Sequence, residues 1–143
     1  MLDHFGVRLR DSDVSLPFYR ACLPPLGITV IQEQPEWKAV IFMQEGSPIF
    51  MWIGQGEAEW LEKNAAPRMH IGFRAKTPEA VDAFYQAAMA AGGVDNGPPG
   101  YRNPTLYSAF VFDPDGNNIE AIYQTYRPFP DQLSGAPPET AGR

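Results

Sequence analysis

The chain has 143 residues, of which 44% are hydrophobic, and this is enough for one globular domain with a sizeable core. Its 11 Lys and Arg residues against 17 Asp and Glu residues give a net charge of −6 with no basic run, which argues against a nucleic-acid partner. The single cysteine, Cys22, excludes an internal disulfide, and no stretch is long and apolar enough for a membrane span. We therefore expect a cytoplasmic protein.

The chain contains an internal repeat. Residues 4–27 match residues 70–93 without a gap, at seven of 24 positions. Unrelated segments of this length would share about one or two positions, so the match indicates a duplicated unit. The only two histidines of the chain, His4 and His70, occupy the same position in the two copies.

Each copy opens with a stretch of alternating residue types, which predicts a strand with one buried face and one polar face. The residues of the buried face are Phe5, Val7 and Leu9 in the first copy and Ile71, Phe73 and Ala75 in the second. The residues of the opposite face are His4, Gly6 and Arg8, and His70, Gly72 and Arg74.

A helix is expected after each opening strand. In the second copy it follows Thr77 as N-cap and ends at Gly92 and Gly93. In the first copy Pro17 lies inside the helical segment and predicts a kink or a late start.

About three strands are expected after each helix, and the last two form a hairpin. Residues 44–47 and 113–116 carry the Gly, and in the second case also the Pro, that favour tight turns. The segments around these turns align at an offset of 70, which pairs Phe50 with Glu120. Glu120 is flanked by apolar residues on its strand, and a buried carboxylate is costly unless it is paired or bound to a metal.

The pattern predicts an α+β fold made of two βαβββ modules in tandem, related by a pseudo-twofold axis. We expect a single domain over residues 1–126, with modules at about 2–54 and 68–125 and a linker at 55–67. Residues 127–143 contain four prolines and few large apolar groups, which is typical of an extended tail.

Three side chains form a candidate metal site. A pseudo-twofold arrangement of the two modules would bring His4 and His70 to a shared central groove, and Glu120 supplies a carboxylate. Two imidazoles and one carboxylate with open positions suit one divalent transition metal, such as Fe, Mn, Zn, Ni or Co, better than Mg or Ca.

Three motifs resemble the vicinal oxygen chelate superfamily, which includes glyoxalase I, extradiol dioxygenases and the fosfomycin- and bleomycin-resistance proteins. They are H-x-G-x-R-x-x-D-x-D-x-S-x-x-F-Y near the start, H-I-G-F-R in mid-chain and D-P-D-G-N-N-I-E near the end. The resemblance covers about residues 2–125. It implies that the two modules form a cup-shaped mixed-sheet barrel around a metal bound by His4, His70 and Glu120, and that the protein is a homodimer.

Three activities of that superfamily each meet a departure in this chain. Glyoxalase I has a fourth ligand, at the position that the repeat aligns with Phe50. Extradiol dioxygenases commonly have a tyrosine at the position of Phe110, and fosfomycin-resistance enzymes have a threonine at the position of Gly6.

Two functional hypotheses therefore stay open. The first is a metal-dependent enzyme acting on a small organic substrate with vicinal oxygens, either dioxygenase-like or lyase- or isomerase-like, with Glu120 able to shuttle a proton. The alternative is a protein that sequesters a small molecule, such as an antibiotic, without catalysis. The candidate residues of the substrate pocket are Phe50, Trp52, Phe110, Tyr101, Arg102, Arg8 and Arg74.

Overall fold

The computed structural model describes residues 3–56 and 68–125. The expected tail, and the expected linker apart from residues 55 and 56, lie outside the described residues. The elements of the first half are β1 (His4–Arg8), α1 (Ser12–Cys22), η1 (Pro24–Leu26), β2 (Ile28–Gln34), η2 (Pro35–Trp37), β3 (Ala39–Gln44) and β4 (Phe50–Gly54). Those of the second half are β5 (His70–Arg74), α3 (Pro78–Ala90), β6 (Val94–Asn103), β7 (Leu106–Phe112) and β8 (Asn118–Gln124).

The strands form two four-stranded mixed sheets, one in each half of the chain. The strand orders are β1-β4-β3-β2 and β5-β8-β7-β6, so the two halves have the same topology. In each sheet the opening strand pairs in parallel with the closing strand, while the remaining neighbours are antiparallel. This confirms the predicted tandem of βαβββ modules.

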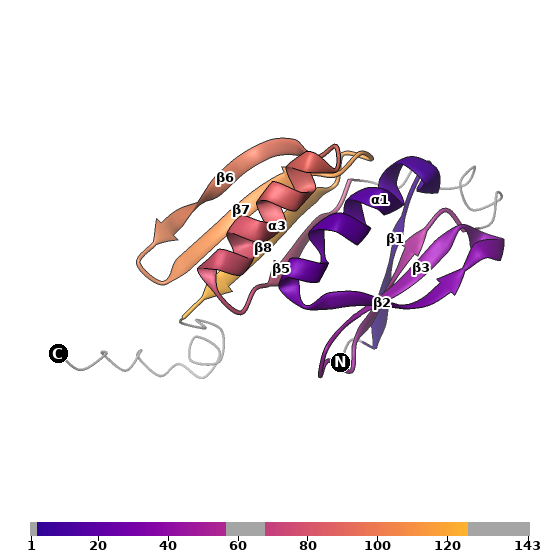
Figure 1. Cartoon of the computed structure of the whole chain (residues 1–143), viewed down its shortest axis with the longest axis horizontal. Helices are drawn as coiled ribbons and strands as arrows, with labels where there is room; N and C mark the ends of the chain where they lie inside the picture. The colour runs from indigo at the N-terminus through magenta and orange to yellow at the C-terminus, as the bar shows by residue number, and fades with distance from the viewer. Residues whose placement is uncertain (1–2, 57–67, 126–143) are drawn as a thin grey trace.

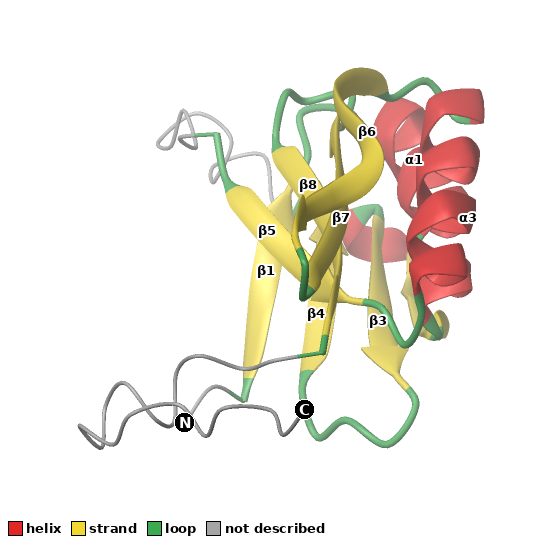
Figure 2. Cartoon of the chain, turned by 90° about the vertical axis from the view of Figure 1, so that its left-hand side faces the viewer, coloured by secondary structure: helices red, strands yellow, loops and turns green. Residues whose placement is uncertain are grey.

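Helices α1 and α3 lie on the same side of the molecule and pack against each other, so among the described residues no helix covers the opposite face of either sheet, called the open face below (Figures 1 and 2). Helix α3 begins after Thr77, whose hydroxyl accepts a hydrogen bond from the Ala80 amide, as predicted. Helix α1 begins at Ser12 with Asp11 as N-cap, so of the two expected alternatives, a kink or a late start, the late start is wrong. Capping at Asp11 and the burial of the Phe18 side chain outweigh the cost of a proline within the helix. Within the described ranges, none of the helices is long and apolar enough to cross a membrane.

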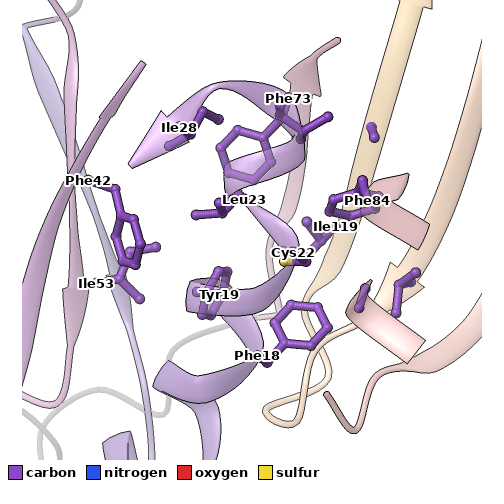
Figure 3. Close-up of a cluster of buried hydrophobic side chains, with 14 of the residues drawn as sticks. Phe18, Tyr19, Cys22, Leu23, Ile28, Phe42, Ile53, Phe73, Phe84 and Ile119 are labelled. Atoms are coloured by element: carbon purple, nitrogen blue, oxygen red, sulfur yellow. The ribbon is translucent and has the colours of Figure 1, made fainter. Parts of the chain in front are cut away.

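A single hydrophobic core is shared by the two halves (Figure 3). Phe18 and Cys22 of α1 lie in the same cluster as Phe84 of α3 and Ile119 of β8, and all four are fully buried. Burial also raises the pKa of the Cys22 thiol, so this residue behaves as a small core hydrophobe. The alternation expected in the opening strands is confirmed, because Val7, Leu9, Phe73 and Ala75 are buried, and Phe5 and Ile71 pack partly buried against the core.

The turn between β7 and β8 fastens the second half to the first. The buried Asp113 carboxylate accepts hydrogen bonds from the Tyr19 hydroxyl at 2.5 Å and from the backbone and side-chain amides of Asn117 at 2.7 and 2.8 Å. Asp115 accepts from the Ser15 hydroxyl at 2.6 Å and from the Arg10 amide at 2.9 Å. Burial, and then the charge of Asp113, raise the pKa of Tyr19. The D-P-D-G-N-N motif is therefore a docking element between the halves.

The strand register corrects the alignment of the repeat. Gly6 of β1 lies opposite Trp52 of β4, and the equivalent Gly72 of β5 lies opposite Glu120 of β8. The counterpart of Glu120 in the first half is therefore Trp52, and the predicted counterpart, Phe50, lies two residues away.

A difference in hairpin length accounts for one residue of the misalignment. The other arises in the preceding strands, where the register pairs Ile41 with Trp52 and Phe110 with Glu120, an offset of 69 instead of 70. In the first half Met43 pairs with Phe50 across residues 44–49, whereas in the second half Phe112 pairs with Asn118 across the shorter segment 113–117. An alignment without gaps cannot keep both strands of the two hairpins in register.

Candidate metal and substrate site

The open face of the second sheet carries a histidine beside a carboxylate. His70 begins β5 and Glu120 lies in the middle of the adjacent strand β8, with His70 Nε2 3.3 Å from Glu120 Oε2. The imidazole is 53% exposed, while Glu120 is only 9% exposed. Gly72, the strand neighbour of Glu120, has no side chain to cover the carboxylate. The nitrogen of a half-exposed imidazole and an oxygen of a largely buried carboxylate therefore meet at one point on the open face.

The environment of Glu120 favours a carboxyl group that can bind a cation or hold a proton. Burial raises the pKa of Glu120 above its usual range, and this effect exceeds the opposing effects of its neighbours. Those neighbours are the charge of His70, hydrogen bonds from Ser108 and His70, and the charge of Arg102, all of which favour the ionised form. A group balanced in this way is typical of functional sites.

A polar support for Glu120 lies on the next two strands of the sheet, β7 and β6. Ser108 of β7 is fully buried, and Arg102 of β6 donates hydrogen bonds to its carbonyl at 3.1 Å and to its hydroxyl at 3.4 Å. Arg102 also donates to the Pro98 carbonyl at 2.8 Å, and its guanidinium lies 5.4 Å from the centre of the Phe110 ring. Sequence reasoning named Arg102 and Phe110 but missed Ser108. The available signal was its position two residues before Phe110, which places it on the same face of β7.

His4 stands apart from this pair in the single chain. Its ring stacks on Phe50 with centroids 4.7 Å apart, and its Nδ1 lies 2.7 Å from the Asp3 carboxylate. In residues 3–56 and 68–125 no group of three or more His, Cys, Asp or Glu side chains could hold a metal. One chain therefore joins His70 to Glu120 but does not bring His4 to them, contrary to the expected shared groove.

The open face of the first sheet carries an aromatic cavity instead of a carboxylate. It has a volume of about 390 Å³ and is lined by His4, Gly6, Arg8, Trp37 and Trp52. The indole nitrogen of Trp52 donates a hydrogen bond of 2.7 Å to the Gln34 side chain, which fixes the ring. Two predicted pocket residues, Arg8 and Trp52, thus line one cavity, and His4 forms part of its wall.

The remaining pocket candidates have other surroundings. Arg74 donates to the Gln124 carbonyl at 3.3 Å and lines a different hollow, together with Lys76 and Tyr123. Tyr101 is exposed and packs edge-on against Tyr107, with ring centroids 4.9 Å apart. Phe110 stacks near His70 at 6.3 Å, so it alone of these aromatic rings adjoins the histidine and carboxylate pair.

The sequence belongs to a family whose members share this fold. Residues 1–121 match the Glyoxalase/Bleomycin resistance protein/Dioxygenase superfamily, so the chain is a member of that superfamily. A probable lactoylglutathione lyase of Vibrio cholerae is 29% identical over 128 residues, which cover 83% of this chain and 87% of that protein.

Solved structures agree with this assignment. A glyoxalase/bleomycin resistance protein from Albidiferax ferrireducens T118 superposes with a TM-score of 0.70 and 32% identity, covering 87% of this chain and 98% of that one. TnmS3, an antibiotic binding protein from Streptomyces sp. CB03234, shares the fold with a TM-score of 0.60 and 19% identity, over 87% of this chain and 96% of its own. Members of the superfamily bind small molecules, are typically metal-dependent and often form dimers.

Proposed function

We propose that the protein is a divalent-metal-dependent enzyme that moves a proton on a small organic substrate with vicinal oxygens, in the manner of a lyase or isomerase. The observation that carries this proposal is the contact between His70 and the buried Glu120 on an open sheet face. A divalent metal bound there would act as a Lewis acid on the substrate oxygens.

The donor atoms of the pair fit a transition metal. An imidazole nitrogen and a carboxylate oxygen from adjacent strands are ligands that Fe, Mn, Zn, Ni and Co accept, whereas Mg and Ca prefer an all-oxygen set. A third ligand is needed, and we propose that His4 of a second copy supplies it. His4 is 56% exposed and lies on the open face of its own sheet, so a homodimer could place it against the second half of its partner.

Glu120 supports proton transfer over oxygen-dependent ring cleavage. Its carboxylate lies on the open sheet face beside His70, where it could accept a proton from a bound substrate and return it. The phenol that extradiol dioxygenases commonly place beside the site is replaced here by Phe110, which cannot donate a proton. The similarity to a probable lactoylglutathione lyase points in the same direction.

A second candidate function is the sequestration of a small molecule without catalysis. The aromatic cavity around Trp52 and the fold shared with an antibiotic binding protein favour it. The two candidates differ in one measurable property, because only the enzyme requires a metal held by His70 and Glu120.

The test combines metal analysis with mixed dimers. We expect the purified protein to bind about one transition metal per chain, and His4→Ala and His70→Ala each to abolish tight binding. Co-expression of the two variants should then restore about a quarter of the sites, because each mixed dimer contains one intact site built from the two unmutated histidines. A wild-type protein that binds no transition metal would leave the sequestration function in place. Two variants that bind metal normally would show that other residues hold it.

A further inference from the structure

The two indoles on the open face of the first sheet have no role in the proposed proton transfer. Trp37 remains 38% exposed, although it is a large apolar side chain, and with Trp52 it lines the cavity of about 390 Å³. We infer that this cavity binds an aromatic ring of the substrate, so that the substrates are aryl compounds with two adjacent oxygen atoms. The two adjacent oxygen atoms of the substrate follow from the proposed function, on which this part of the inference rests. The preference for an aromatic ring follows from the cavity alone.

The geometry of Trp52 favours binding through the ring face. Its indole nitrogen is already bonded to Gln34 at 2.7 Å, so it is not free to bind a polar group of a ligand. A Cβ atom at Gly6 would lie 3.7 Å from Trp52 Cε3, so the glycine leaves that part of the ring uncovered. The apolar surface of the indole is the part that remains for a ligand.

Trp37 is held in place by its backbone. It ends the short helix η2, and Lys38 follows it in the left-handed conformation with a φ of 44°. Its carbonyl accepts a hydrogen bond of 3.0 Å from the Gly56 amide. The Trp52 ring and the backbone that carries Trp37 are therefore set before a ligand arrives, which lowers the entropic cost of binding.

Aromatic surfaces prefer aromatic partners over aliphatic groups of the same size. Offset-stacked or edge-to-face ring pairs gain binding energy beyond that of the buried area alone. The cavity volume lies at the lower end of the range for small-molecule sites, about 300 to 1,000 Å³, and suits a group of one or two rings.

The cavity adjoins the proposed metal position through His4. This residue forms part of the cavity wall and is also the third proposed ligand. A substrate with its oxygens at the metal would therefore reach the indoles with a ring attached directly to the oxygen-bearing carbons. In the second half, the residue opposite the glycine of the opening strand is Glu120. In the first half it is Trp52, which contributes to substrate specificity.

The test uses two ligands that differ only in aromaticity. Mandelate and hexahydromandelate carry the same hydroxy-acid group on a phenyl and on a cyclohexyl ring, and their affinities are measured by calorimetry with the metal-loaded and the metal-free protein. We expect the wild type to bind mandelate several-fold to about tenfold more tightly in both states. Trp52→Leu should bring the ratio of the two affinities to about one, because leucine is apolar but offers no ring face.

Two further variants keep the result interpretable. Gly6→Val places a side chain in the cavity from the open face of β1 without altering the core. It should reduce mandelate affinity because it fills part of the space for the ring. Tyr85→Leu removes an aromatic ring on the helix-covered side, where its hydroxyl bonds to Asp95, and should leave the ratio unchanged.

The outcomes separate this inference from the proposed function. A wild-type ratio near one in both states, or a ratio that survives Trp52→Leu, would overturn the aromatic preference even if the metal binds. If no metal binds, the proposed function fails, and the ratio in the metal-free protein still decides the aromatic preference.

Discussion

The two halves of the molecule have the same strands in the same order, yet their open faces carry different chemistry. Opposite the glycine of the opening strand, the second half places Glu120, supported by Ser108 and His70, and the first half places Trp52, bonded to Gln34. The helix-covered faces of both sheets contribute to one shared core. The helix-covered positions are thus apolar in both halves, while the open-face positions differ, with a carboxylate in one half and an indole in the other.

Removal of His70 should have the largest effect, because it deletes the imidazole of the second half. His70→Ala is expected to weaken metal binding more than about a hundredfold, since it removes a ligand rather than a supporting group. The thermal midpoint should change little, because the exposed ring leaves no core cavity. Calorimetry of metal binding and thermal unfolding measure the two effects. Arg74→Ala, on the same face of β5, is the control and should leave metal affinity intact.

Loss of the Tyr19 hydroxyl should weaken the connection between the halves. Tyr19→Phe leaves the buried Asp113 with one donor fewer and is expected to cost about 2 kcal/mol of unfolding free energy. Tyr85→Phe, which removes a more exposed hydroxyl, should cost less than about 0.5 kcal/mol. Equal losses of unfolding free energy for the two variants in urea would show that the buried Tyr19–Asp113 hydrogen bond stabilises the fold no more than the exposed one.

The same contact predicts a pH dependence. Because the folded-state pKa of Tyr19 is raised, its contribution is complete below the ordinary tyrosine pKa of about 10 and is lost as the pH rises above that value. Wild-type stability should therefore fall above about pH 10, and Tyr19→Phe should flatten this decline. Urea midpoints measured between neutral and alkaline pH provide the comparison, and parallel curves for the two proteins would contradict it.

Ser108→Ala should show how much the support of the Glu120 carboxylate contributes to metal binding, because it leaves the proposed metal ligands themselves in place. The counterpart of Ser108 in the first sheet is Ala39, so the change makes the second half more like the first. Loss of a group that orients a ligand is expected to weaken metal binding about ten- to a hundredfold. Arg102→Gln should have a smaller effect in the same direction, since Arg102 acts through Ser108. Unchanged metal affinity in both variants would mean that Glu120 needs no such support.

The smallest expected effect comes from giving the first half a carboxylate. Trp52→Glu should tighten metal binding about tenfold by adding a charged ligand, and should reduce activity because one open position is lost. Phe50→Glu is the matched control, since Phe50 shares the sheet face but pairs with His4 instead of Gly6. If Phe50→Glu tightens metal binding and Trp52→Glu does not, the counterpart of Glu120 at the site is Phe50, as the ungapped alignment predicts, and not Trp52, as the strand register indicates.

The strands, their faces and the burial of Glu120 could be predicted because they depend on local patterns. Alternation identified the buried face of β1 and β5, and the apolar neighbours of Glu120 indicated its burial. The position of Trp52 could not be predicted, because a one-residue difference between the hairpins adds to a one-residue shift of the strands before them, and neither changes the alternating pattern of a strand. The separation of His4 from His70 also lay beyond the sequence, because repeat spacing does not say whether two modules face each other within one chain.

The docking of the Asp113 turn on α1 has a consequence for how the chain folds. Tyr19 and Asp113 are 94 residues apart in the sequence, and the core they border draws on both modules. Such distant contacts slow folding and make it cooperative. Although each module has a complete βαβββ topology, the first one synthesised would expose Phe18 and leave Tyr19 without its acceptor. The duplicated chain should therefore unfold in a single transition, and its first module should not fold before the β7–β8 turn has been made.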